Sequence, residues 1–395
     1  MIGKAISFIA GSVILIALAC PPMTCVSAAA AAEPASEQEQ ALKLAFIKLC
    51  DANAQALDKQ AVDRVLHSWG CFDSYVARAL AAAYDLEGKQ EYLAACKRWS
   101  DQTLEFQKGM IPKGAYYMHY GRKPGEDKGK WYVADSSCIA MGVLATAVRC
   151  DDPEEKAKYL DSVKAFYRLV ADNWVLPSGG VANGHWPKSD KEYWCAAGTF
   201  GSLAFLLYRE TGDEECLKIG LGTIDWLNKK DLQTVAYDHY EGFVTPSVLM
   251  FCLESYSAGL PHLKPGGPRY KDAMRQLAKA QEWITQNGGG QTDAALRERG
   301  VDPATGKVDK LYVGGYLSQR GSKLGGLPFH LMVQSKWTPD GEGLTLAADK
   351  ELIHIAGVLK DAPPTCKLAA FTLMSLAEKF APGKIYRTSS KQDRR

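Results

Sequence analysis

The sequence lacks the features that mark several common classes of protein. Its 47 basic and 45 acidic residues leave a net charge of +2, so it has no surplus of positive charge with which to neutralise the phosphates of a nucleic acid. It contains no Cys-x-x-Cys pair, no cluster of His and Cys, and no Gly-x-Ser-x-Gly turn that would present a nucleophilic serine. We therefore expect no nucleic-acid partner, no metal and no other cofactor.

Long apolar runs are also missing, apart from residues 5–19 near the N-terminus. This run is too short for a transmembrane helix and has the length of a signal-peptide core. We therefore interpret residues 1–32 as a signal peptide and Ala-rich linker, with cleavage near residues 28–32 and no membrane span afterwards. The mature protein would be exported to the periplasm, the cell envelope or the medium. The alternative is a loose lipoprotein site that ends at Cys20.

Cysteine is plentiful, but its spacing does not indicate a disulfide scaffold. Two of the eleven cysteines belong to the N-terminal leader. The other nine stand singly among helical stretches, at Cys50, Cys71, Cys96, Cys138, Cys150, Cys195, Cys216, Cys252 and Cys366. Most of them are expected to be small buried apolar residues, and the pairing of any disulfide after export stays open.

Apolar residues recur with the 3.6-residue period of a helix along nearly all of the remaining chain, and no alternating strand pattern competes. The pattern predicts helices near residues 37–57, 72–87, 90–108, 134–149, 153–174, 194–211, 213–229, 241–258, 268–287, 322–335, 345–360 and 363–379. Every second helix has few charges, whereas its neighbours carry Lys and Glu on one face. Six buried helices that alternate with six amphipathic ones predict two concentric rings, an all-α (α/α)6 toroid over residues 37–382, followed by a basic flexible tail at 383–395. An open helical-repeat solenoid is the alternative.

The predicted loops are of two kinds. Those within each helical hairpin have mostly two to five residues, whereas those that lead from an outer helix to the next inner helix are long. The long ones span roughly residues 109–133, 175–193, 230–240 and 288–321. Long loops in a compact domain are usually functional, and in a toroid these would all emerge on one face.

A Trp-x-x-x-Asp-Ser pattern occurs twice, ending in Asp73-Ser74 and in Asp135-Ser136, and each copy starts a predicted inner helix. An aspartate here could simply cap its helix. That interpretation leaves the recurring Trp unexplained, and two carboxylates in different surroundings can divide into the acid and the base of glycosidic chemistry. We therefore predict Asp135 and Asp73 as catalytic residues.

The long loops and helix starts carry many of the aromatic and His residues. Aromatic rings with interleaved polar groups suit a sugar, because its C–H face stacks while its hydroxyls need donors and acceptors. An Arg in these loops could bind a uronate carboxylate through two hydrogen bonds. The predicted substrate-binding residues are Trp69, His119, Tyr120, Arg122, Trp131, His185, Trp186, Trp194, His239, Tyr240 and Arg320. The alternative for each single aromatic is that it wedges its loop onto the rings.

Two stretches resemble the unsaturated glucuronyl and rhamnogalacturonyl hydrolases of the six-hairpin glycosidase superfamily. WYVADSSCIAMGVLATA is similar to their Trp-x-x-Asp helix start with a later Met, with one residue inserted before Asp135. GGVANGHWPKSDKEYWCAAGTFGSLAFLL is similar to their Gly-rich, His-containing loop and the helix after it. Where those enzymes carry Arg-Gly-Asn-Gly-Trp, however, this chain has Ala197-Gly198-Thr199-Phe200-Gly201, so their substrate contacts at this point do not carry over.

The resemblance implies an enzyme that hydrates the C4–C5 double bond of an unsaturated uronate, without metal or cofactor. It also implies that Asp135 is the general acid/base with Asp73 as its partner, and that His185 and Trp186 line the sugar site. We accordingly predict an exported glycoside hydrolase acting on uronic-acid-containing oligosaccharides or polysaccharides. The alternatives are a polysaccharide lyase on the same toroid that uses Tyr240 and His239, and a non-catalytic envelope protein that binds glycan or protein.

Overall fold

The computed structural model describes residues 36–58, 70–117, 131–185, 191–230, 232, 239–240, 243–244, 247–287, 315–318 and 321–389. The chain divides into two units, Met1–Ser36 and Glu37–Arg395. The predicted signal peptide, the alternative lipoprotein cysteine and the last six residues lie outside the described residues.

Twelve α-helices form two concentric rings in the described part of the second unit. The inner helices are α2 (Gly70–Glu87), α4 (Val133–Ala147), α6 (Trp194–Thr211), α9 (Ser247–Gly259), α12 (Leu327–Ser335) and α14 (Lys367–Phe380). The outer helices are α1 (Glu37–Asp58), α3 (Gln90–Lys108), α5 (Pro153–Asn173), α7 (Glu214–Asn228), α10 (Pro268–Asn287) and α13 (Gly341–Leu359). The 3₁₀ helices are η1 (Leu260–His262), η2 (Gly315–Leu317) and η3 (Gly321–Gly326).

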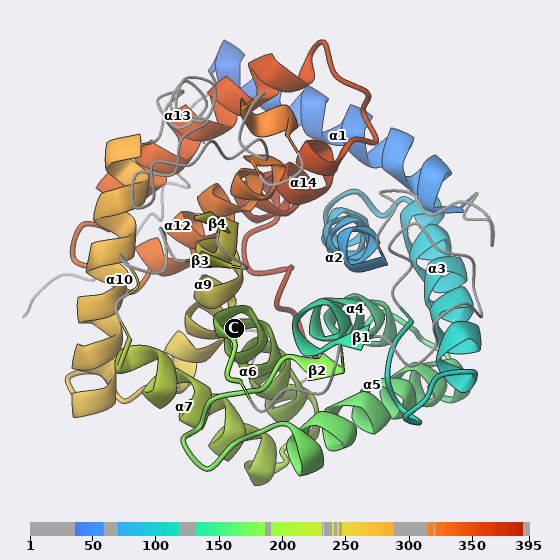
Figure 1. The fold of residues 1–395 in the computed structure, drawn as a ribbon. Coiled ribbons are helices and arrows are strands. Elements are labelled where there is room, and N and C mark those ends of the chain that lie inside the picture. The colour runs from blue at the N-terminus through green and yellow to red at the C-terminus, as the bar shows by residue number, and fades with distance from the viewer. Residues whose placement is uncertain are drawn as a thin grey trace, which may run out of the picture. The chain divides into compact units, whose positions relative to one another are not determined.

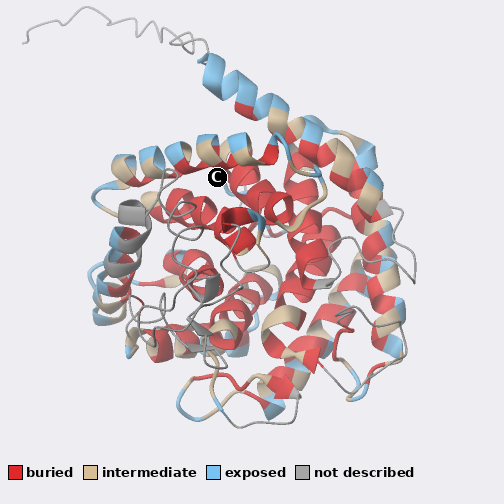
Figure 2. Ribbon diagram, turned by 45° about the horizontal axis from the view of Figure 1, so that its top comes forward, coloured by how far each residue is buried: buried red, intermediate tan, exposed pale blue. Residues whose placement is uncertain are grey.

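The inner ring closes on itself. Each inner helix packs against the next in the order α2, α4, α6, α9, α12 and α14, and α14 packs against α2 (Figure 1). The inner helices are buried nearly all round, whereas the outer helices expose their outward faces (Figure 2). The charge alternation therefore predicted the two rings correctly, because a helix surrounded by other helices cannot carry solvated charges along its length. The (α/α)6 toroid is confirmed, and the open solenoid is wrong.

Local capping chemistry fixes several helix ends at the short loops. The Asp152 side chain accepts a hydrogen bond from the amide of Glu154 at the start of α5, and Asp213 caps α7 in the same way through Glu215. Gly212, which ends α6, has a φ of 76°, a left-handed conformation that favours glycine. These two caps turn the chain within two to five residues, so α4 is followed closely by α5 and α6 by α7.

A buried ion pair crosses the interior of the ring. The Arg78 guanidinium on α2 donates to both carboxylate oxygens of Glu254 on α9, at 3.0 and 3.2 Å. Burial alone would raise the pKa of Glu254, but the guanidinium outweighs burial and the pKa is lowered. The Tyr386 hydroxyl donates a third hydrogen bond to this carboxylate at 2.7 Å. A charge so far from water requires such full pairing.

The C-terminal segment, residues 381–389, lies across the end of the ring at which α2, α4 and α6 finish. Arg149, just after α4, donates to the Lys384 carbonyl at 2.8 Å and to Asp85 near the end of α2 at 2.6 Å. The amide of Ser389 donates to Glu210, near the end of α6, at 2.6 Å. Figure 1 shows this segment, in red, running through the middle of the ring. The prediction of a flexible tail is therefore wrong for residues 383–389, whose contacts bury several of their side chains.

Close helix packing explains the glycines of α6. A Cβ atom on Gly198 would lie 2.1 Å from the carbonyl oxygen of Phe251 on α9. A Cβ atom on Gly201 would lie 2.1 Å from the Thr223 hydroxyl of α7 and 2.5 Å from the Ser255 hydroxyl of α9. Both glycines thus let α6 approach its neighbours. The small residues of this stretch therefore serve helix packing, which is consistent with the absence here of the substrate-binding residues of the glucuronyl hydrolases.

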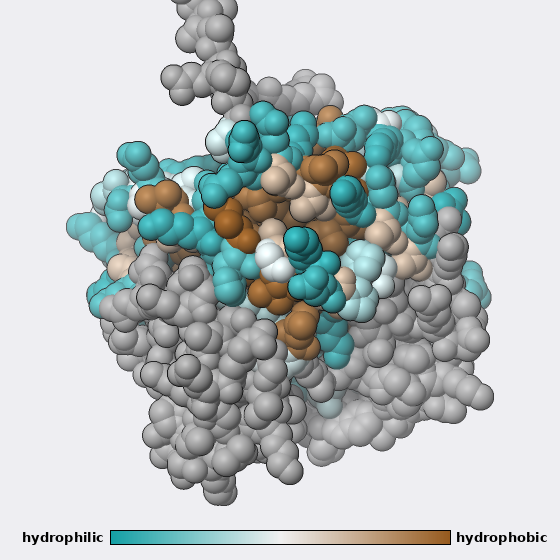
Figure 3. Space-filling view, turned by 90° about the horizontal axis from the view of Figure 1, so that it is seen from above, coloured by the Kyte–Doolittle hydropathy of each residue, from teal (hydrophilic) through white to brown (hydrophobic). Residues whose placement is uncertain are grey.

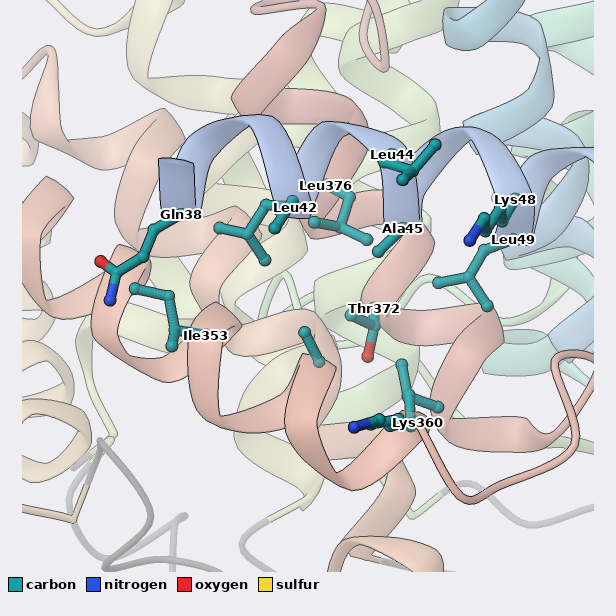
Figure 4. A pocket seen from close by; sticks show the side chains of 13 residues that line it. Gln38, Leu42, Leu44, Ala45, Lys48, Leu49, Ile353, Lys360, Thr372 and Leu376 are labelled. Carbon is teal, nitrogen blue, oxygen red and sulfur yellow. The ribbon is translucent and has the colours of Figure 1, made fainter. Parts of the chain in front are cut away.

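An apolar groove of about 500 Å³ separates the outer helices α1 and α13 above α14. Apolar side chains gather on this face with hydrophilic ones around them (Figure 3), and Leu42, Leu49, Ile353 and Leu376 line the groove (Figure 4). Leu44, which also lines the groove, is 56% exposed. No helix in the described part of the chain combines the length and apolarity that crossing a bilayer requires.

All nine cysteines of the described chain are free thiols, and seven of them are buried. The prediction that most of them act as small apolar residues is confirmed.

Candidate functional site

The N-terminal ends of the inner helices gather at the end of the ring opposite the C-terminal segment. We define the mouth as the first turns of α2, α4, α6, α9 and α14 together with η3, which leads into α12. The described residues at the C-terminal ends of the long predicted loops lead into the inner helices on this side, for example Trp131–Tyr132 before α4 and residues 191–193 before α6. Helix N-termini present unpaired amides and partial positive charge, so the mouth suits a polar or anionic ligand.

A short sheet joins the two stretches that carried the family resemblance. Strand β1 (Trp131–Tyr132) pairs antiparallel with β2 (Gly184–His185), with Trp131 opposite His185. Gly184 has a φ of 102°, and a Cβ atom there would lie 3.1 Å from the Trp131 carbonyl oxygen, so this pairing needs glycine. The structure thus brings the Gly-rich loop beside the start of α4.

Asp135 lies in the first turn of α4 and is partly exposed. Its carboxylate accepts a hydrogen bond from the Cys71 thiol, which lies in the first turn of α2. Burial raises the pKa of Cys71 well above its usual range, and Asp135 adds to this effect, so the thiol stays protonated and can donate. Asp135 is therefore an accessible carboxylate at the seam between two inner helices.

Asp73 occupies a different kind of position. Successive side chains advance by about 100° around a helix, so Asp73 lies about 200° from Cys71 on α2. Tyr75 and Arg78, close to Cys71 on this wheel, face the interior, whereas the backbone of Ala77, close to Asp73, contacts Cys96 on the outer helix α3. Asp73 has no exposed surface. The structure therefore places the two predicted carboxylates on different faces and gives only Asp135 access to the mouth.

Trp131 is part of the hydrophobic core. It is completely buried, with its ring edge-to-face against Phe166 at 6.2 Å and Trp174 at 5.0 Å between centroids. The structure corrects the prediction that Trp131 stacks on substrate, because a ring packed against α5 has no free face. Trp131 instead anchors the end of its loop to α5, as the alternative interpretation of the aromatic residues predicted.

Trp194, the first residue of α6, is partly exposed at the mouth. Its ring meets that of Trp226 edge-to-face at 5.6 Å, and the Lys230 ammonium lies 5.8 Å from its centroid. These contacts hold the ring while part of it faces solvent, so Trp194 keeps its predicted role as a candidate stacking residue.

Most other predicted substrate-binding residues fall outside what the structure describes. Trp69, His119, Tyr120, Arg122, Trp186 and Arg320 are not among the described residues. The backbone of His185 lies in β2, and His239 and Tyr240 form β3 (His239–Tyr240), which pairs with β4 (Phe243–Val244). The roles of these nine residues therefore stay predictions.

The structure adds two lysines that the sequence analysis did not identify. The Lys323 ammonium of η3 lies 5.0 Å from the Phe251 ring centroid, and that of Lys367, the first residue of α14, lies 5.3 Å from the Phe72 centroid. Burial, helped by the charge of Lys323, lowers the pKa of Lys367. The sequence held a signal for them, because each lysine stands at the start of a long uncharged stretch, residues 324–335 after Lys323 and residues 368–377 after Lys367.

Beneath the lysines, aromatic rings from three inner helices connect. Phe371 on α14 lies 5.2 Å from Phe72 and 4.7 Å from Tyr75, and Tyr75 lies 6.5 Å from Phe251 on α9. All four side chains are buried. They form a rigid apolar floor that fixes where the two ammonium groups stand.

Comparisons with known proteins agree with this architecture. No family model matches the chain, and no curated protein matches it in sequence. An alpha-1,6-mannanase of Salegentibacter sp. HEL1_6 superposes on 86% of this chain and 99% of its own, with a TM-score of 0.56 and 14% identity. An inactive variant of that enzyme with alpha-1,6-mannotriose covers 88% and 100% of the two chains at 13% identity and the same TM-score. A polysaccharide lyase covers 87% and 98% with a TM-score of 0.55 and 10% identity.

Identities this low speak for the fold alone. This chain therefore has the six-hairpin toroid fold that is shared by a glycoside hydrolase and a polysaccharide lyase.

Proposed function

We propose that the protein is an exported glycoside hydrolase that acts at the mouth on oligosaccharides containing an unsaturated uronic acid. The observation that carries the proposal is Asp135, a partly exposed carboxylate at the seam of α2 and α4. It stands at the end of the toroid opposite the one that the C-terminal segment covers. A general acid must reach both its substrate and the water that restores its proton, and Asp135 meets that requirement.

The proposed reaction is a net addition of water. Asp135 donates a proton to C4 of the unsaturated ring, and the oxygen of a water molecule bonds to C5. That water returns a proton to Asp135, and the resulting hemiketal opens. The Cys71 hydrogen bond orients the carboxylate throughout. Asp73, buried on the outer side of α2, supports the start of the helix and takes no part in the proton transfer.

Alpha-1,6-mannanase activity is not part of the proposal. The inactive mannanase variant carries asparagine in place of two consecutive aspartates. The one Asp-Asp pair of this sequence is Asp151-Asp152, and Asp152 caps α5 in the loop after α4. That loop lies at the end of the ring covered by the C-terminal segment, far along α4 from Asp135, so a dyad of that kind has no counterpart at the mouth.

A lyase is the second candidate, favoured by the polysaccharide lyase that shares the fold. It would use Tyr240 and His239, in the loop region between α7 and α9, to remove the C5 proton of an intact polyuronate. The two activities change the ultraviolet absorbance in opposite directions, because a lyase creates the conjugated double bond that the proposed hydrolase removes.

The test follows the ultraviolet absorbance of that double bond with lyase-generated uronate oligosaccharides. Wild-type protein should remove the absorbance, and Asp135→Asn should lower the rate by about 10²–10⁴-fold, the usual contribution of a general acid. Asp73→Asn serves as the matched variant and should keep the rate per folded molecule. An equal loss of rate in both variants would contradict the proposal that Asp135 is catalytic and Asp73 is not. A rise in absorbance on intact polyuronate would identify the protein as a lyase. An absorbance that stays constant with every glycan would favour a non-catalytic binding protein.

A further inference from the structure

We propose that α1 is the centre of a two-fold dimer interface, in which a second copy of this chain lays its own α1 antiparallel along the apolar groove between α1 and α13. The inference does not depend on the proposed glycan chemistry. It rests on the order of the exposed side chains along α1 and on the groove beside them (Figure 4).

The groove is apolar, and large side chains beside it are exposed. Leu49 and Leu376 are buried in its lining, whereas Leu44 of α1 and Ile353 of α13 line it and are exposed. Leu346 lies two turns before Ile353, so it is on the same side of α13, and it is exposed as well. Exposed apolar patches with polar rims mark sites of interaction between proteins. The outer face of α1 and α13 has this character.

One stripe of α1 faces solvent. Glu37, Ala41, Leu44 and Lys48 follow each other at intervals of four, three and four residues, so they lie along one side of the helix. All four residues are exposed, and Ala41, Leu44 and Lys48 line the groove. The intervals are the same when the helix is followed in either direction. The stripe can therefore be paired in register with a copy of itself that runs the opposite way.

The antiparallel pairing brings complementary side chains together. A two-fold axis between Ala41 and Leu44 sets Leu44 of each copy against Ala41 of the other, so a large side chain meets a small one. The same axis sets Glu37 of each copy against Lys48 of the other, and each contact occurs twice by symmetry. The stripe is thus complementary to itself in both size and charge.

The charges of the groove favour this direction over a parallel one. The charged residues in its lining are Lys48 and Lys360, and both lie at the end of the groove away from Gln38. Gln38 is next to Glu37 in the acidic first turn of α1. An antiparallel copy brings its acidic helix start to the two lysines, whereas a parallel copy would set Lys48 against Lys48. Electrostatic complementarity of this kind fixes the register of an interface.

The first experiment measures the mass of the purified chain by sedimentation equilibrium over a range of concentrations. Wild type should reach the mass of two chains. Leu44→Lys places two ammonium groups beside the two-fold axis and should raise the dissociation constant of the dimer by about a hundredfold or more. Ile111→Lys changes an exposed apolar residue outside α1 and α13 and should leave the dissociation constant unchanged.

Reversal of the charges tests the register. Glu37→Lys and Lys48→Glu should each raise the dissociation constant by about tenfold or more, because each sets like charges against each other at two places. The double variant restores opposite charges and should dimerise like wild type. Urea unfolding should be the same for all variants, because the substituted side chains are exposed in the single chain.

Three outcomes would overturn the proposal. A chain that stays monomeric at its highest soluble concentration would leave the groove to a different partner. A dimer that Leu44→Lys does not weaken would have its interface elsewhere. A double charge reversal that fails to restore the dimer would exclude the antiparallel pairing of α1.

Discussion

Burial of His330 makes the stability of the toroid depend on pH in a way that can be measured. His330 lies on α12, 1% exposed, and its Nδ1 atom is 2.8 Å from the Ser257 hydroxyl on α9. Burial lowers its pKa to about 4, although the neighbouring Glu254 carboxylate acts in the opposite direction. The histidine therefore stays neutral in the folded protein at a pH at which the unfolded chain binds a proton.

The sign and size of the effect follow from proton linkage. A depressed pKa contributes stability that is complete above the unfolded value of about 6.5 and is lost as the pH falls towards the folded value. At pH 5 the unfolded imidazole is almost fully protonated, whereas about nine-tenths of the folded imidazole is neutral. Lowering the pH from 7 to 5 should therefore cost about 2 kcal/mol of unfolding free energy through His330 alone.

The assay is urea unfolding of wild type and His330→Gln at both pH values, followed by helical circular dichroism. The variant is expected to be less stable at pH 7, because its amide fits the site less well, but to lose about 2 kcal/mol less than wild type between pH 7 and pH 5. His354→Gln on α13 controls for removal of an imidazole and should keep the wild-type dependence. Identical pH dependence in His330→Gln and wild type would refute the reasoning.

Two further predictions concern packing. Trp131→Ala should lower the free energy of unfolding by about 3–5 kcal/mol, as removal of a buried aromatic does. Trp131→Phe should lower it by less and leave glycan affinity unchanged. A selective loss of affinity in the stable Phe variant would instead identify Trp131 as a ligand contact. Gly198→Ala should destabilise by about 1–3 kcal/mol or more, because its Cβ would clash with the Phe251 carbonyl. Gly357→Ala, whose Cβ would meet nothing within 4 Å, should instead stabilise by up to about 1 kcal/mol. Thermal unfolding of both glycine variants measures this difference, and equal effects would contradict the packing argument.

The fold could be predicted because its signal is spread over many residues. The alternation between uncharged and amphipathic helices predicted both rings, and most predicted helix bounds agree with the structure within a few residues. The start of α9 was placed at residue 241 and lies at Ser247, because β3 and β4 occupy the residues before it. The C-terminal segment was missed because its contacts join distant parts of the chain, such as Tyr386 with Glu254, and no local pattern records such a contact.

The candidate site was less predictable because it depends on which way single side chains point. The repeated motif made Asp73 and Asp135 look equivalent, yet the structure buries one and leaves the other accessible. Lys323 and Lys367 lie more than 40 residues apart in the sequence and come together only because α14 closes the ring beside η3.

The closure of the ring by its last residues bears on how the chain folds during synthesis. Helix α1 packs against α13 and α14, and the final described residues bind carboxylates on α2, α6 and α9. A nascent chain from which residues 386–389 have not yet emerged has the acceptors but not their partners, and its two ring edges remain unjoined. Contacts of such large sequence separation form late, so the toroid is completed only after these residues have left the ribosome. A chain that crosses a membrane before that point would travel unfolded and close its ring on the far side.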